Sequence, residues 1–148
     1  MKLFTDIKAF FFDVDGVLTD GNVLALETGE MARRVNSKDA FAIQLALKLG
    51  YTVAVISGGN AKGVRRRMEQ LGVRELHFKS ARKLPVYEQI KTTHELQDRE
   101  IMYIGDDLPD TEVMAAAGLA ACPADAADDV LIKADYITRR PGGHGAVR

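Results

Sequence analysis

Hydrophobic residues along the chain fall into short runs that alternate with stretches of helical periodicity. Six short runs lack the polar–apolar alternation of a half-buried strand, so each predicts a strand covered on both faces. These strands are expected at residues 7–12, 51–57, 75–78, 100–105, 119–122 and 135–138. Apolar spacing between them predicts helices at residues 38–49, 61–71, 82–96, 110–117 and 126–132. This order is typical of a parallel sheet with helices on both faces.

One segment departs from that alternation. The runs VLAL (23–26) and MARRV (31–35) flank the turn sequence ETGE, which contains Gly29, and together predict a β-hairpin. We therefore predict an α/β fold, a Rossmann-like three-layer sandwich with a mostly parallel central sheet and a small β-hairpin extension. No repeat or flexible linker is apparent, so we expect one domain over residues 1–148, with the hairpin at about 20–36 and a tail at about 139–148.

Composition and net charge exclude only a few classes of function. Hydrophobic residues make up 47% and charged residues 28% of the chain, an ordinary globular balance. The net charge of −1 argues against a general binder of nucleic acid or of anionic membranes. The single cysteine, Cys122, suits a reducing cytoplasm and is expected in the core. No signal peptide or membrane span is expected, because AFFF is short and meets an aspartate at once.

The first predicted strand ends in two aspartates, Asp13 and Asp15, one residue apart. In extended backbone that spacing places both side chains on one face. Two carboxylates about 4 Å apart repel by roughly 4 kcal/mol at an effective dielectric of 20, so a cation or a shared proton is needed. Taken alone, the pair could equally be turn-capping aspartates. The spacing does not fit an EF-hand loop.

Polar residues also follow two later strands, at the sheet edge where open α/β proteins bind ligands. Ser57, Gly58 and Gly59 offer a hydroxyl and unencumbered N–H groups, which suit an anion, although a simple strand–helix turn has the same composition. The sequence GDDLPD places three further acids, which suit a hard cation: Asp106, Asp107 and Asp110. The last of these could instead cap the next helix.

Three basic residues precede the helix expected at 82–96: Lys79, Arg82 and Lys83. Any of them could reach a phosphate or simply lie on the surface. Carboxylates, a hydroxyl and a basic group together predict phosphoryl transfer, whose catalysis is mostly positioning and charge neutralisation. On this hypothesis Asp13 is the nucleophile that forms an acyl phosphate, and Asp15 is the general acid and base. A bound Mg²⁺ screens Asp13 from the anionic substrate.

In this order the motifs DVDGV, ISGG, a lysine and GDDLPD resemble those of the haloacid dehalogenase superfamily of phosphatases, over most of the chain. The resemblance implies that Asp13 is the nucleophile and that Asp15 is both the acid/base and, through its backbone carbonyl, a metal ligand. It also implies that Asp106 binds Mg²⁺. The remaining implied roles are phosphate contacts for Ser57 and Lys83, a water-mediated role for Asp107 and an orienting role for Asp110.

About twenty residues separate the first motif from the helix near Lys38, which leaves room for a hairpin but not for a cap domain. The hairpin sequence and the tail RRPGGHGAVR resemble the capless subfamily that hydrolyses 3-deoxy-D-manno-octulosonate 8-phosphate in lipopolysaccharide precursor synthesis. The expected partner is therefore a small sugar phosphate. The same resemblance implies a homotetramer with sites near subunit interfaces. It also places Arg33, Asn36 and Lys38 near the site entrance, although each could be a solvated residue.

Two more substrate contacts are expected. Arg67 lies in RRRMEQ, a sequence more typical of a solvated helix face, but could reach a substrate carboxylate.

The apolar hairpin residues are too many for an exposed ribbon, so several hairpins are expected to pack around a symmetry axis. The tail would then lay Arg148 over the neighbouring subunit's site. Relatives usually continue past this tail with another helix, so we expect the sequence to be a shortened form.

Three alternatives remain. A related activity uses a nine-carbon 2-keto sugar acid 9-phosphate; such relatives tend to carry Glu at the position of Gly59, so the glycine favours the eight-carbon sugar. A non-catalytic regulatory or scaffold protein would not require all of Asp13, Asp15, Lys83 and Asp106. A response-regulator receiver needs its acceptor aspartate after a middle strand, where this chain has Ser57.

Overall fold

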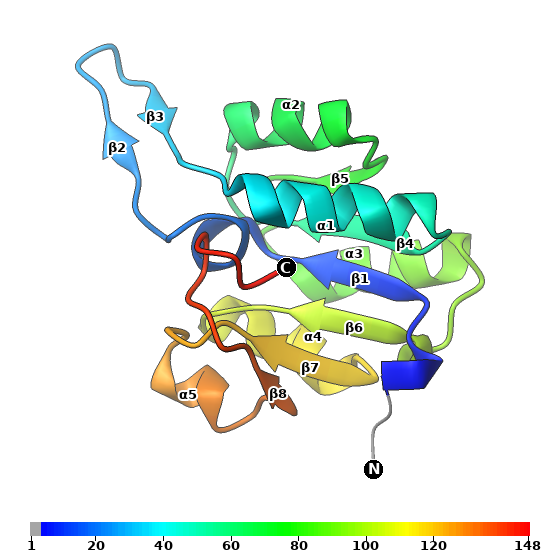
Figure 1. Cartoon of the computed structure of the whole chain (residues 1–148). Helices are drawn as coiled ribbons and strands as arrows, with labels where there is room; N and C mark the ends of the chain where they lie inside the picture. The colour runs from blue at the N-terminus through cyan, green and yellow to red at the C-terminus, as the bar shows by residue number, and fades with distance from the viewer. Residues whose placement is uncertain (1–3) are drawn as a thin grey trace.

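The computed structural model describes residues 4–148 and places a six-stranded sheet between two layers of helices (Figure 1). Neighbouring strands of this sheet are parallel throughout, in the order β5-β4-β1-β6-β7-β8. The strands are β1 (Ala9–Phe12), β4 (Thr52–Ile56), β5 (Glu75–His77), β6 (Ile101–Ile104), β7 (Leu119–Cys122) and β8 (Tyr136–Ile137). The predicted α/β class and parallel sheet are confirmed.

Two helices pack on one face of the sheet and three on the other. The first layer holds α1 (Ser37–Lys48) and α2 (Lys62–Leu71); the second holds α3 (Lys83–Thr93), α4 (Thr111–Ala116) and α5 (Asp128–Leu131). All five lie where the apolar spacing predicted them, with ends that differ by up to a few residues. Among residues 4–148, no helix has the length and apolar character needed to cross a bilayer.

The unalternating strands have apolar neighbours on both sides. Phe11 points into the α3 layer, where its ring meets Tyr87 edge-on at 5.7 Å between centroids. Phe12 points the other way, into the cluster that contains Ile43 of α1. Cys122 is fully buried in β7, as expected. A strand covered on both faces needs apolar residues at every position, which explains the run of phenylalanines before Asp13.

The hairpin forms a separate two-stranded antiparallel sheet that projects from the body (Figure 1). Its strands, β2 (Leu24–Ala25) and β3 (Met31–Ala32), are shorter than the apolar runs that predicted them. Leu24 and Met31 are 64% and 57% exposed. The chain then passes directly into α1, so no cap domain lies between the first motif and this helix.

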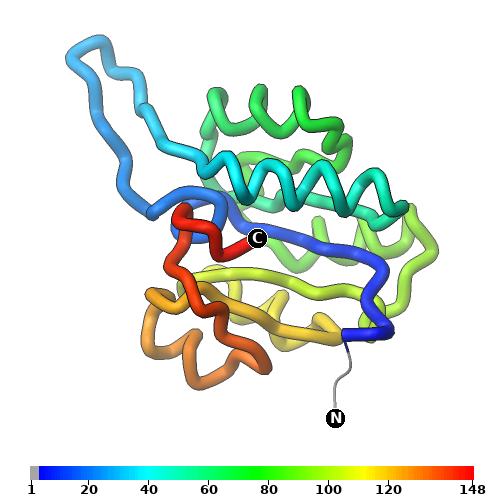
Figure 2. Tube along the Cα trace, in the orientation of Figure 1, coloured from blue at the N-terminus to red at the C-terminus, as the bar shows by residue number. Residues whose placement is uncertain are grey.

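The C-terminal tail (residues 139–148) runs from β8 back to the loop that follows β1 and ends beside α1 (Figure 2). Val147 packs against the core cluster between the sheet and α1. The expectation that Arg148 lies over a neighbouring subunit's site stays a prediction, since the structure describes a single chain. The tail packs on its own chain, because its glycines allow the backbone to approach that loop closely.

Candidate active site

The centre of the sheet brings three of the motifs together. Phe12 at the end of β1 lies in register with Val55 of β4 on one side and Ile104 of β6 on the other. The chain adds β4 and β5 on one side of β1 and then crosses over to add β6 on the other side, so the strand order reverses here, at the carboxyl ends where open α/β sheets bind ligands. Asp13, Ser57 and Asp106 follow the three strands at this edge.

Asp13 lies against a buried lysine. The Nζ atom of Lys83 is 2.9 Å from Asp13 Oδ1 and 2.7 Å from Asp110 Oδ1. Burial opposes the charge on Lys83, but the two carboxylates outweigh it and raise the pKa of its ammonium group. Lys79 and Arg82 are exposed. Of the three basic residues that the sequence left open, Lys83 is therefore the one at the site.

Asp110 is fully buried, and both of its oxygens accept hydrogen bonds. Lys83 and the hydroxyl of Tyr103, at 2.6 Å, donate to Oδ1. The backbone N–H groups of Asp106 and Asp107 donate to Oδ2 at 3.1 and 3.4 Å. Gly105 makes room for this arrangement, since a Cβ there would lie 2.4 Å from the Cβ of Asp110. The oxygens of Asp110 are therefore already engaged by Lys83, Tyr103 and the backbone that follows β6.

The acidic cluster has the chemistry of a cation site. Oxygens of Asp13, Asp106 and Asp110 lie within 4.8 Å of one another. Burial, followed by the charge of Asp110, raises the pKa of Asp13 to about 6. Burial and the charge of Asp13 raise the pKa of Asp106 to about 8. A hard divalent cation such as Mg²⁺ would relieve this repulsion, and Asp13 and Asp106 are the side chains left to bind it.

Gly16 allows the ends of β1 and β6 to approach each other. Its φ is +85°, and a Cβ there would lie 1.9 Å from Asp106 Oδ2. Sequence reasoning missed Gly16, and it also missed Tyr103 and Thr19. The hydroxyl of the fully buried Thr19 accepts the N–H of Gly21 at 3.2 Å and so helps to shape residues 13–20, the aspartate loop. The only sequence signal for Gly16 was its place directly after the paired aspartates.

Asp15 turns toward the hairpin rather than toward the cluster. Arg33 donates from Nε to Asp15 Oδ1 at 2.6 Å and from Nη2 to Oδ2 at 3.1 Å. The backbone leaves the extended conformation at Val14 and turns through Gly16, so the condition under which Asp13 and Asp15 would share one face is not met. Arg33 therefore lies at the site, where its guanidinium is paired with the Asp15 carboxylate.

The ISGG motif lies beside this ion pair. Ser57 is buried, and its Oγ accepts the N–H of Gly59 at 3.2 Å. A Cβ on Gly59 would lie 3.7 Å from Asp15 Oδ2 and 3.9 Å from Arg33 Nη2. A Cβ on the adjacent Gly58 would lie 3.8 Å from the carbonyl oxygen of Ser80. The motif therefore lies beside Asp15 and Arg33, and its phosphate contacts stay a prediction.

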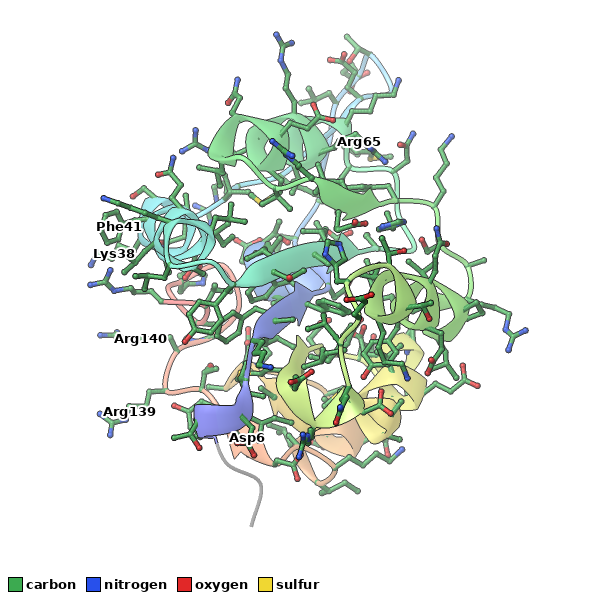
Figure 3. All side chains as sticks on the ribbon, turned by 90° about the vertical axis from the view of Figure 1, so that its right-hand side faces the viewer. Asp6, Lys38, Phe41, Arg65, Arg139 and Arg140 are labelled. Atoms are coloured by element: carbon green, nitrogen blue, oxygen red, sulfur yellow. The ribbon has the colours of Figure 1, made fainter. Side chains whose placement is uncertain are left out.

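Several expected substrate contacts lie in a separate groove of about 690 Å³ between the start of α1 and the tail. Asn36 caps α1 by accepting the N–H of Lys38 at 2.8 Å. The guanidinium of Arg148 lies 5.4 Å from the centre of the Phe41 ring. Figure 3 shows Lys38 on the same side of the molecule as Arg140, another residue of the groove. This groove, rather than the acid cluster, holds Asn36, Lys38 and Arg148.

Two more predicted residues lie apart from the cluster. Arg67 is half-buried on α2 and forms no ion pair within residues 4–148, whereas Arg65 stacks over the ring of Phe78 at 4.6 Å. Asp107 is exposed, and its Oδ1 accepts the N–H of Leu108 at 2.7 Å. Asp107 therefore caps the turn after β6.

A family model described as haloacid dehalogenase-like hydrolase matches residues 72–147. The 3-deoxy-D-manno-octulosonate 8-phosphate phosphatase of Yersinia pestis is 38% identical over 143 residues, which are 97% of this chain and 76% of that protein. This chain belongs to the haloacid dehalogenase-like hydrolases. The predicted resemblance is thereby confirmed.

Solved structures of other haloacid dehalogenase-like hydrolases have the same fold. The crystal structure of the Yersinia pestis phosphatase has a TM-score of 0.94 at 38% identity and covers 96% of this chain and 77% of that one. A second is the 3-deoxy-D-manno-octulosonate 8-phosphate phosphatase of Moraxella catarrhalis in complex with magnesium ion, phosphate ion and KDO. Its TM-score is 0.92 at 30% identity, with 96% of this chain and 82% of that one covered.

The metal-free form of this haloacid dehalogenase-like hydrolase should lose stability as the pH rises from 5.5 to 8.5. The pKa of Asp13 is about 6 and that of Asp106 about 8 in the folded chain, against 3.8 for both in the unfolded chain. Over this range the folded state binds more protons, so the free energy of unfolding falls with pH. With chelator present, the melting temperature should drop by about 4 °C or more. Added Mg²⁺ should stabilise more at pH 8.5 than at pH 5.5.

An Asp106→Asn variant should show a shallower dependence on pH, whereas Asp129→Asn, on the exposed surface of α5, should keep the wild-type slope. Equal slopes in all three proteins would contradict the raised pKa of Asp106.

Proposed function

We propose that this chain is a Mg²⁺-dependent phosphatase of a sugar-acid phosphate, with 3-deoxy-D-manno-octulosonate 8-phosphate as substrate. The observation that carries this proposal is the buried Lys83 ammonium between Asp13 and Asp110, beside Asp106. The names of the relatives support the substrate, and the magnesium ion bound by the Moraxella catarrhalis enzyme supports the metal. We further propose one catalytic domain over residues 1–148, acting in the cytoplasm in lipopolysaccharide precursor synthesis.

In the proposed reaction, Asp13 attacks phosphorus and forms an aspartyl phosphate as the bond to the sugar oxygen breaks. Asp15 protonates that oxygen, then takes a proton from the water that hydrolyses the aspartyl phosphate. Lys83, Ser57 and the N–H groups after β4 hold the phosphate oxygens. When bound by Asp13, Asp106 and the Asp15 carbonyl, Mg²⁺ supplies charge neutralisation. Asp110 keeps Lys83 in place, and Asp107 acts through water.

The ion pair with Arg33 constrains the role of Asp15. Both oxygens of Asp15 accept hydrogen bonds from the Arg33 guanidinium, so neither is free to contact a leaving oxygen. Arg33 must therefore release Asp15, and Asp15 must take up a proton from solvent, before it can protonate the leaving oxygen. The anionic phosphate competes for the same guanidinium, so substrate binding itself would release Asp15. On this proposal Arg33 contacts the substrate during turnover, which fits its expected place near the site entrance.

Asp15→Asn should slow the release of the free sugar acid from its phosphate far more than the release of p-nitrophenolate. The sugar oxygen needs a proton to leave, whereas nitrophenolate leaves as the anion. We expect the rate of aspartyl phosphate formation to fall about 10²-fold or more for the sugar phosphate and much less for p-nitrophenyl phosphate. Rapid-quench measurement of this step with both substrates decides the matter. Equal losses would show that Asp15 is not the general acid.

A panel of phosphate esters tests the substrate. The eight-carbon sugar-acid phosphate should give the highest kcat/KM, above the nine-carbon 9-phosphate and neutral hexose phosphates. Gly59 favours the smaller substrate, since a Glu side chain there would begin beside Asp15 and Arg33. Preference for the nine-carbon substrate would replace the proposed substrate with the alternative. No phosphate release from any ester, with Mg²⁺ present, would favour a scaffold protein.

We propose that Lys38, Arg148 and Asn36, with Arg67 from α2, contact the acidic sugar in the assembled protein. The charge of the groove supports this, because its lining residues include basic side chains and no acid. These contacts should affect KM for a sugar acid and not for p-nitrophenyl phosphate.

The protein is expected to be a homotetramer held together by its hairpins. Exposed apolar residues on β2 and β3 support this, since an isolated two-stranded ribbon is only marginally stable. Light scattering should give four chains for the wild type. Leu24→Asp should dissociate it, whereas Ile132→Asp, at an 80% exposed position on the last turn of α5, should not. A fully active wild-type monomer in dilute solution would overturn the assembly.

A further inference from the structure

The C-terminal tail contacts the aspartate loop through two glycines. The N–H of Gly143 donates to the carbonyl oxygen of Val17 at 3.1 Å, and the N–H of Gly142 donates to Asp125 Oδ1 at 2.8 Å. A Cβ on Gly142 would lie 1.8 Å from the carbonyl oxygen of Gly16. The two backbones therefore touch with no side chain between them. The tail blocks any movement of the loop in its direction.

Gly16 is consequently enclosed on two sides. Its carbonyl meets the tail at Gly142, and the place where its Cβ would be lies 1.9 Å from Asp106 Oδ2. Only one residue thus separates the tail from a carboxylate of the acid cluster. Because packed interiors transmit small displacements, a shift of the tail would move Gly16 and change the spacing between Asp13 and Asp106.

The far end of the tail is held by Asp39, in the first turn of α1. Asp39 is only 2% exposed, and its Oδ1 accepts the N–H of Arg148 at 2.9 Å. Its Oδ2 is the one buried side-chain oxygen or nitrogen within residues 4–148 that has no hydrogen-bond partner. Burial raises the pKa of Asp39, and the N–H of Arg148 acts in the opposite direction. Burying a carboxylate is unfavourable, and this contact with the tail offsets part of the cost.

We propose that Asp39 is a positioning residue for the phosphatase reaction: it anchors the tail, and the anchored tail holds the aspartate loop at its working distance from Asp106. The catalytic half of this inference rests on the proposed function, whereas the structural half stands without it. The inference gives the tail a role within its own subunit. Asp39 does not contact Asp13 or Asp106, so it acts through the tail alone.

Asp39→Ala should lower kcat about tenfold or more for sugar phosphates and p-nitrophenyl phosphate alike. KM for p-nitrophenyl phosphate should change by less than about threefold, whereas KM for the sugar acid also reports the contact proposed for Arg148. A tail that only binds substrate would leave kcat unchanged and raise KM for the sugar acid alone. Hydrogen exchange in the metal-loaded protein should accelerate at residues 14–20 and 142–148, and stay unchanged in β4 and α3.

Asp39→Asn should restore most of the activity. The amide oxygen can accept the N–H of Arg148, so the variant removes the charge and keeps the hydrogen bond to the tail. Asp129→Ala is the matched control, because it removes the same charge from the first turn of α5 without touching the tail. It should behave as the wild type in both measurements.

Each outcome decides the proposal. Unchanged exchange at residues 14–20 in Asp39→Ala would overturn the anchoring role, and faster exchange with an unchanged kcat would overturn the positioning role. If wild-type protein hydrolyses no ester, the proposed function fails, while hydrogen exchange still tests whether Asp39 anchors the tail.

If Asp39→Ala does not fold, Gly142→Ala replaces it, since the added Cβ collides with Gly16 and leaves Asp39 intact. Gly63→Ala, whose Cβ meets nothing within 4 Å, is its control.

Discussion

Replacing Asp13 with asparagine should abolish phosphate release, with kcat reduced by about 10⁴-fold or more. An amide of the same shape cannot displace the sugar oxygen and form an acyl phosphate. The fold should persist, because Lys83 keeps its hydrogen bond to Asp110 and the removed charge is one of several that repel each other. Steady-state phosphate release at saturating Mg²⁺ measures the effect, and rapid quenching measures the aspartyl phosphate.

Saturating Mg²⁺ matters in this experiment, because Asp13 is also expected to bind the ion. A variant that recovers activity at high Mg²⁺ would have lost metal affinity rather than the nucleophile. Asp129→Asn serves as the control for removal of an exposed acid. Substantial turnover by Asp13→Asn with Mg²⁺ at saturation would show that another group attacks phosphorus.

Removing Mg²⁺ with a chelator should stop hydrolysis, and excess Mg²⁺ should restore it. Without the cation, the substrate dianion would approach the carboxylates of Asp13, Asp106 and Asp110, whose charge the ion pairs with Lys83 offset only in part. Protons compete with the metal for Asp13 and Asp106, whose pKa values are about 6 and about 8 in the metal-free protein. The Mg²⁺ concentration for half-maximal rate should therefore rise as the pH falls below 8.

Asp106→Asn should raise the Mg²⁺ concentration for half-maximal rate by about tenfold or more. Loss of a residue that only hydrogen-bonds to a metal ligand already lowers metal affinity by about tenfold, and Asp106 is expected to bind the metal directly. Titration of activity with Mg²⁺ at pH 6.5 and 8.0 compares the two proteins. Turnover by the fully chelated wild type would contradict both the metal requirement and the role of Asp106.

The chain order of apolar runs was enough to predict the parallel sheet. A strand buried on both faces must be largely apolar. The runs IKAFFF and YTVAVI therefore predict buried strands without knowledge of which strands pair with them. The carboxyl ends of parallel strands meet at one edge, so Asp13, Ser57 and Asp106 could be predicted as neighbours from their places after strands. These predictions depend on local pattern and on one general rule of α/β topology.

The partners of the charged side chains could not be predicted in the same way. Lys79, Arg82 and Lys83 are equivalent in the sequence, and only the packing of α3 against the sheet buries Lys83 between Asp13 and Asp110. The pairing of Arg33 with Asp15 depends on the direction in which the hairpin leaves the body. Side-chain direction at a turn depends on backbone angles such as φ +85° at Gly16, which no residue pattern specifies.

The amino-acid sequence by itself therefore determined the α/β class, the order of the elements and the set of groups for phosphoryl transfer. These follow from hydrophobic periodicity and from residue chemistry, both of which are local. Tertiary structure alone decided that Asp110 accepts hydrogen bonds from Lys83 and Tyr103, that Asp15 pairs with Arg33, and that the tail lies beside the aspartate loop of its own chain. Those results depend on contacts between segments far apart in the chain, such as Asp39 with Arg148, whose distances exist only once the sheet has formed.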